Sequence, residues 1–166
     1  MSVLTPNRLA FLALANEYCH AVENARQADR ADFVADMLRL LPRIYIAASD
    51  IPRPDFQQDP AYIAPALDED YYDSVRLSME MLLGEDDTFL EVFEQDMKYS
   101  ETPIAASISE SLADIFQVLY NLIDSAKDAP AEIVVALLDA CRDDFDEYWS
   151  QPLCNVLRAL NAIRQN

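Results

Sequence analysis

Residues 96–126 read DMKYSETPIAASISESLADIFQVLYNLIDSA, and their apolar side chains recur at the spacing of an α-helix. Thr102 followed by Pro103 predicts where this helix begins, because a proline at the first helical position loses no hydrogen bond. The helix is expected to continue to about Lys127. Steps of 4, 4, 3, 4 and 3 residues predict one buried face, made of Ile104, Ile108, Leu112, Ile115, Leu119 and Leu122.

A polar stripe runs along another face of the same helix. Glu110 and Asp114 are like charges one turn apart, which costs about 0.2–0.5 kcal/mol on an exposed helix. This repulsion suits either a solvated face or a surface that binds a cation or a basic partner, and both interpretations stay open. The stripe consists of residues that accept hydrogen bonds and carry no positive charge: Ser107, Glu110, Asp114, Gln117, Asn121 and Asp124.

Two further residues precede this stripe and complete a candidate binding set near the expected start of the helix. They are Asp96 and Tyr99. No catalytic residue and no metal ligand can be assigned from the pattern, and no cofactor is predicted. The candidate binding residues are therefore Asp96, Tyr99, Ser107, Glu110, Asp114 and Gln117.

The rest of the chain predicts more helices of the same kind. Gly84, the single glycine, follows the last periodic residue of one of them, where a left-handed end is expected. The scarcity of glycine and the absence of Asn-Gly or Asp-Gly pairs disfavour a sheet. Six or seven amphipathic helices predict one all-α bundle over residues 1–166. The other expected helices begin at Pro6 after Thr5, at Asp29, at Asp68, at Thr88, at Pro130 and at Pro152.

Prolines mark two places where this pattern is interrupted. Pro42 lies inside the second helix and is expected to kink or split it. Residues 50–67 read DIPRPDFQQDPAYIAPAL and predict an ordered, proline-rich, extended connection. Phe56, Tyr62 and Ile63 are expected to hold this connection against the bundle.

The charge is strongly acidic and unevenly placed. The chain carries a formal charge of −18, yet residues 1–53 hold six acids and six bases. Residues 77–141 hold fourteen acids against Lys98 and Lys127 alone. This distribution excludes a nucleic-acid binder with a basic face and disfavours an anionic membrane. It would attract a basic protein partner, while the oligomeric state stays open.

Several reaction classes lack the residues they need. Glu17 and His20 have the spacing of a ligand pair in di-metal bundles, but His20 is the single histidine, so a second pair is impossible. The same shortage leaves little scope for a Ser-His-Asp relay, and a single glycine excludes glycine-rich phosphate loops. His20 is thus expected to lie on the surface. Trp149 is expected in the core, with a partner-binding anchor as the alternative.

The cysteines and the apolar runs indicate a compartment. Cys19, Cys141 and Cys154 fall among apolar helix positions and are expected to be small buried hydrophobes. The first residues lack a clear signal-peptide pattern, and no apolar stretch approaches 18 residues. These features predict a cytoplasmic protein with reduced thiols.

Three stretches carry a resemblance to a known family: LLPRIYIAAS at 40–49, residues 82–123, and FDEYWSQPLCNVLRAL at 145–160. Together they resemble a bacterial family classed only as a domain of unknown function, made of stand-alone helical proteins of about this length. The most specific part is residues 96–117. The resemblance implies an all-α, free-standing bacterial cytosolic protein and lends no reaction, ligand or catalytic residue.

Two functional hypotheses follow, with a third in reserve. The first is a non-enzymatic interaction or regulatory protein whose acidic surface meets a basic partner. The second is a helical bundle that uses a small ligand or a divalent metal, with enzymatic activity left open, through carboxylates on the 103–127 helix. The third is a protein that mimics nucleic acid by its charge. Its acids, however, are clustered by segment and are not spaced like phosphates.

Overall fold

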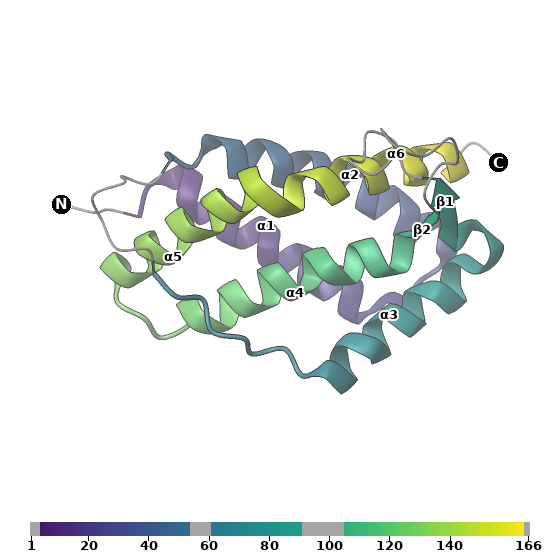
Figure 1. The fold of residues 1–166 in the computed structure, drawn as a ribbon, viewed down its shortest axis with the longest axis horizontal. Coiled ribbons are helices and arrows are strands. Elements are labelled where there is room, and N and C mark those ends of the chain that lie inside the picture. The colour runs from purple at the N-terminus through teal and green to yellow at the C-terminus, as the bar shows by residue number, and fades with distance from the viewer. Residues whose placement is uncertain (1–3, 54–60, 91–104, 165–166) are drawn as a thin grey trace.

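A computed structural model describes residues 4–53, 61–90 and 105–164 of the chain (Figure 1). Two short 3₁₀ turns, η1 (Ala25–Gln27) and η2 (Gly84–Asp87), and a π-helical turn, η4 (Phe145–Trp149), connect neighbouring helices or strands. Two short strands also form, β1 (Thr88–Leu90) and β2 (Ala105–Ser107). The α-helices are α1 (Pro6–Glu23), α2 (Arg30–Asp50), α3 (Glu69–Leu83), α4 (Ile108–Ala126), α5 (Ala131–Asp144) and α6 (Ser150–Arg164).

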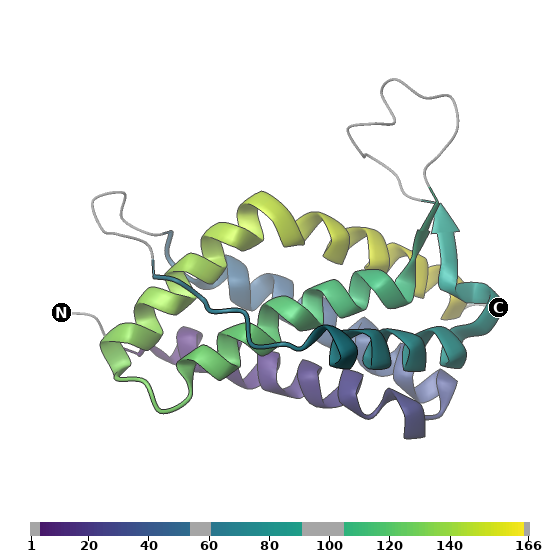
Figure 2. The same ribbon diagram turned by 60° about the horizontal axis from the view of Figure 1, so that its bottom comes forward.

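Helix α4 is the centre of the packing. It packs against α1, α3, α5 and α6, while α2 packs against α1 and α6 (Figures 1 and 2). The predicted apolar face is confirmed at every position that the structure describes. Its members are completely buried: Ile108, Leu112, Ile115, Leu119 and Leu122. The mostly helical architecture agrees with the all-α expectation at that level.

The helix starts encoded by single residues are confirmed. The Thr5 side chain accepts a hydrogen bond from the Arg8 backbone N–H at 3.3 Å and caps α1. Asp29 and Asp68 cap α2 and α3 in the same way. Gly84 ends α3 with a φ of +59°, and a Cβ there would meet no atom within 4 Å. The positive φ, and not lack of space, therefore favours glycine.

The start of the central helix was predicted wrongly. Residues 105–107 form β2, and α4 begins at Ile108 with Ser107 as its N-cap. The helix expected from Thr88 is wrong over 88–90, which form β1. β1 pairs antiparallel with β2, matching Thr88 with Ser107 and Leu90 with Ala105. Pairing between distant segments overrides local helical periodicity here. Residues 91–104 lie outside the described residues.

The last two expected helices are one continuous helical rod. Helix α5 passes through the π-helical turn directly into α6, so Pro152 does not begin a helix. Pro152 has no backbone N–H to donate to the carbonyl four residues earlier. That carbonyl belongs to Tyr148, which lies within the π-helical turn. Likewise α2 runs through Pro42 without a break. Six or seven separate helices are thus not confirmed within the described ranges.

Other expectations concern single side chains. Residues 61–67 are not helical, and Ile63 packs against the core, but Tyr62 is 78% exposed and does not hold the connection. Phe56 lies outside the described residues. Tyr148 is exposed. Cys19 and Cys141 are buried as expected, whereas Cys154 is exposed. None of the described helices is both long and apolar enough to cross a lipid bilayer.

Candidate functional site

The polar stripe of α4 faces outward, and two of its residues, Asp114 and Asn121, hold other parts of the chain. Asp114 accepts a hydrogen bond from the Tyr72 hydroxyl of α3 at 2.5 Å. The Asn121 side-chain oxygen accepts two hydrogen bonds, from the Ala66 and Leu67 backbone N–H groups, both at 2.9 Å. These contacts fix α3 and the segment before it onto α4. This part of the stripe has a structural use.

The rest of the stripe divides between local contacts and solvent. Asp124 pairs with Lys127 at 3.1 Å. The Glu110 and Gln117 side chains are exposed and make no hydrogen bond or ion pair with any residue in the described ranges. Asp96 and Tyr99 lie outside these ranges. Of the candidate binding residues that the structure describes, Glu110 and Gln117 are therefore the two whose side-chain polar groups are not used within the fold.

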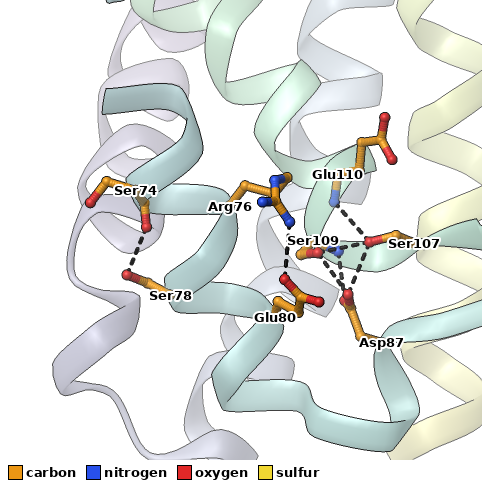
Figure 3. A network of polar contacts seen from close by, with 8 residues as sticks. All are labelled: Ser74, Arg76, Ser78, Glu80, Asp87, Ser107, Ser109 and Glu110. Carbon is orange, nitrogen blue, oxygen red and sulfur yellow. Dashed lines mark hydrogen bonds and ion pairs between the residues drawn. The ribbon is translucent and has the colours of Figure 1, made fainter. Parts of the chain in front are cut away.

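Ser107 belongs to a buried network at the start of α4 (Figure 3). The Asp87 carboxylate, only 6% exposed, accepts hydrogen bonds from the Ser109 N–H and hydroxyl, both at 2.7 Å, and from the Ser107 hydroxyl at 2.9 Å. Ser107 in turn accepts from the Glu110 N–H at 3.2 Å. The carboxylate sits at the positive end of α4, where the helix dipole stabilises an anion.

The sequence carried a signal for this start that the Thr102-Pro103 pattern obscured. Ser107 and Glu110 have the S-x-x-E spacing of a capping box. Nothing in the local sequence marks Asp87, because it reaches Ser109 from 22 residues away. Its role depends on β1 pairing with β2, which brings the two segments together.

Helix α3 is attached to the bundle through two neighbouring tyrosines. The Tyr71 hydroxyl donates to Glu23 of α1 at 2.5 Å, and Tyr72 donates to Asp114 of α4. Partial burial, and then these hydrogen bonds, raise the pKa of both phenols well above the ordinary tyrosine value. The charge of Glu110 also raises the Tyr72 pKa, so Glu110 lies within electrostatic reach of α3.

A second buried charge lies on the opposite side of the core. Arg142, 8% exposed, donates hydrogen bonds to the carbonyls of Ala48, Ser49 and Ile51 at the end of α2, and to Asp146 at 3.1 Å. The Ser49 and Ile51 carbonyls have no other donor in the described residues, while the Ala48 carbonyl also accepts from the Ile51 N–H at 3.2 Å. The guanidinium therefore acts as the C-terminal cap of α2. Sequence reasoning missed this role, since an Arg four residues before an Asp indicates only a surface pair.

Trp149 lies in the core, as predicted, with its ring centroid 4.6 Å from that of Phe145. Close to it, Asp144 has a raised pKa, first because of partial burial and then because of the negative charges of Asp143 and Glu147. Asp143 and Glu147 are both exposed. The π-helical turn and the residues before it thus have an acidic outer face and an aromatic inner face.

The described residues also form an open hollow of about 390 Å³ between α1 and α2. Its charged lining is mixed, with Glu17 and Asp36 against Arg39 and Arg43. His20 is exposed, as expected. Within the described ranges no three His, Cys, Asp or Glu side chains come close enough to hold a metal ion.

Comparisons with known proteins agree with this architecture. The structure is similar to the crystal structure of protein BF1032 from Bacteroides fragilis, a target of the Northeast Structural Genomics Consortium. The two share 28% sequence identity with a TM-score of 0.80, over 96% of this chain and 93% of that one. No curated protein matches the chain. A family model matches residues 2–166, and the chain belongs to that family, described as Domain of unknown function (DUF5063).

Proposed function

We propose that this protein is a non-enzymatic interaction or regulatory protein of the cytoplasm, and that its acidic α3–α4 surface binds a basic protein partner. One observation carries the proposal. Three exposed acids on these two neighbouring helices have no ion-pair partner in the described residues. Asp70 and Asp73 of α3 and Glu110 of α4 make no ion pair with any described residue.

The argument depends on which acids the fold already uses. Asp114 accepts from Tyr72, Asp87 caps α4, and Asp124 pairs with Lys127. Those acids stabilise the protein itself. The exposed acids that remain repel one another and would gain free energy when a cationic surface approaches. Gln117, on the same stripe as Glu110, adds a hydrogen-bonding group.

An affinity capture from a bacterial lysate tests this proposal. The baits are the wild type, an Asp73→Asn/Glu110→Gln variant, and a matched control, Asp32→Asn/Asp36→Asn, which loses two exposed acids from α2. We expect a basic protein to be retained at low salt by the wild type and the control, and lost with the α3–α4 variant. Equal retention by all three baits, or no retained protein, contradicts the proposal.

A small polar ligand is the second candidate, and the hollow between α1 and α2 favours it. Arg39 and Arg43 stand one turn apart there and make no ion pair with a described residue, in a chain that has an excess of acids. This place differs from the α4 face that the sequence indicated. Thermal unfolding with a panel of small anions and zwitterions tests it, with Arg39→Gln/Arg43→Gln as the variant that should lose any stabilisation.

Thermal unfolding with divalent ions, and with a chelator, tests the remaining metal alternative for α4. An ion at about 100 times its Kd adds roughly 2.7 kcal/mol to the native state. Under the interaction proposal, no ion is expected to raise Tm more for the wild type than for Glu110→Gln/Asp114→Asn. An ion that raises Tm of the wild type alone would favour the metal alternative.

A further inference from the structure

Two apolar side chains stand out on the outer face of α3. Leu77 is 47% exposed and Met81 is 76% exposed, on the side of the helix away from the buried Val75 and Met79. They lie four residues apart and therefore share one face. Among the large exposed apolar side chains of the described ranges, they alone are spaced by one helical turn.

Two acidic residues extend this face from the apolar pair toward the start of α3. Asp73 lies one turn before Leu77, and Asp70 lies one turn further toward the start of the helix on the same outward side. Neither pairs with a cation in the described part of the chain. Glu80 has a partner, because Arg76 holds it at 3.0 Å. The face thus has an apolar end and an unneutralised acidic end, and protein interfaces likewise combine apolar and polar parts.

The position of α3 leaves this face accessible. Helix α3 forms an edge of the bundle, and its inner side packs on α4 and η1 (Figures 1 and 2). The outer side of a helix offers no unpaired backbone groups, so a partner must be recognised through side chains alone. A second helix laid alongside can do this, with its apolar residues over Leu77 and Met81.

We propose that the outer face of α3 binds a basic amphipathic helix of a partner protein, with Leu77 and Met81 as apolar contacts and Asp70 and Asp73 as charge contacts. This inference rests on the proposed function and specifies the partner. Charge complementarity selects the occupant, because Lys and Arg one or two turns along the partner helix would meet the two acids. A second copy of this chain, at −18, would bring acid against acid.

The test uses synthetic helices as probes. The first is a labelled peptide of about 18 residues, five turns, with leucine on one face and lysine on the other. The second has the same composition in an order that places leucine on no single face. The third replaces lysine with glutamate. We expect fluorescence anisotropy to show saturable binding of the first peptide alone, weakening as salt rises from about 0.05 to 0.3 M.

Matched variants locate the binding. Leu77→Ser/Met81→Ser is expected to weaken binding at least tenfold, since burial of even one such side chain is worth about that order in affinity. The control Ile133→Ser removes an equally exposed apolar residue from α5 and should leave binding unchanged. Asp70→Asn/Asp73→Asn should weaken binding at low salt and reduce its salt dependence. Asp32→Asn/Asp36→Asn, which also removes a first-turn acid, should not.

The outcomes separate this inference from the proposed function. Unchanged binding in Leu77→Ser/Met81→Ser, an equal loss in Ile133→Ser, or no binding by the wild type would overturn the α3 assignment. If the captured partner still depends on Asp73 and Glu110 in that case, the proposed function survives without it. A dimer seen by light scattering that Leu77→Ser/Met81→Ser dissolves would assign the face to a second copy instead. Circular dichroism checks that each variant is folded.

Discussion

Two buried charges of opposite sign each cap a helix in this protein, the cation at a C-terminal end and the anion at an N-terminal end. At the Arg142 corner, a guanidinium meets three backbone carbonyls at the C-terminal end of α2 and is also paired with Asp146. At the Asp87 corner, a carboxylate meets the N-terminal end of α4 and the hydroxyls of Ser107 and Ser109. No cation in the described residues pairs with Asp87.

The difference shows how an acidic chain can bury charge of either sign. Because the chain has few cations, the Asp87 carboxylate is stabilised by a helix dipole and by neutral hydrogen-bond donors. The cation at the Arg142 corner satisfies more groups, among them the Ser49 and Ile51 carbonyls, which have no other donor in the described residues. The Arg142 corner should therefore contribute more to stability than the Asp87 corner.

The largest expected effect comes from Arg142→Met. This change keeps much of the side-chain volume but leaves the Ser49 and Ile51 carbonyls without a donor in the described residues. We therefore expect a loss of about 2–4 kcal/mol in the free energy of unfolding. Urea unfolding measures it. The control Arg158→Met removes an exposed arginine that reaches the single carbonyl of Leu90 and should cost less than about 1 kcal/mol. Equal losses of stability in Arg142→Met and Arg158→Met would show that the Arg142 cap contributes no more than a surface contact.

Asp87→Asn should have a smaller effect of about 1–2 kcal/mol, measured in the same way. The amide is nearly isosteric, but it has one acceptor oxygen in place of two and loses its favourable interaction with the helix dipole. Glu85→Gln, an exposed neighbour with no ion pair in the described ranges, should stay within about 0.5 kcal/mol. A loss at Asp87 larger than that at Arg142 would reverse the comparison.

Tyr72→Phe tests the attachment of α3 and should cost about 1 kcal/mol at neutral pH. The folded state raises the Tyr72 pKa above the unfolded value of 10.0, so this stabilisation is complete below pH 10 and declines as the pH rises further. As the pH rises above about 10, the wild type should therefore lose more stability than Tyr72→Phe. Parallel pH profiles for the two proteins would show that the hydroxyl hydrogen bond contributes nothing.

The smallest expected effect is a difference in local opening between the α3 side and the Arg142 side of the molecule. The reactivity of the cysteine thiols measures it. Cys154 is exposed and should react first with a thiol reagent under native conditions. Burial raises the Cys19 pKa to about 12, and Cys19 lies close enough to Tyr71 of α3 to affect its titration. Cys141 is next to Arg142 and completely buried. We expect single-cysteine variants to react in the order Cys154, Cys19, Cys141, because α3 opens more readily than the core.

The sequence alone predicted the helices whose cause is local. Thr5, Asp29 and Asp68 each cap a helix through a side chain that reaches a few residues along the chain. The buried face of α4 follows from the 3.6-residue period alone. Likewise the polar stripe could be predicted as a shared outward face, since that too is a property of one helix.

Only the tertiary structure decided what those faces do. Asp87 and Ser109 are 22 residues apart, Tyr72 and Asp114 are 42 apart, and Arg142 and Ala48 are 94 apart. No local pattern encodes such pairs, because they depend on which segments pack together. The pairing of β1 with β2 likewise moved the start of α4 to Ser107, away from the Thr102-Pro103 signal. The packing of α3 and the segment before it on α4 also divided the stripe, because Asp114 and Asn121 hold these elements while Glu110 and Gln117 make no such contact.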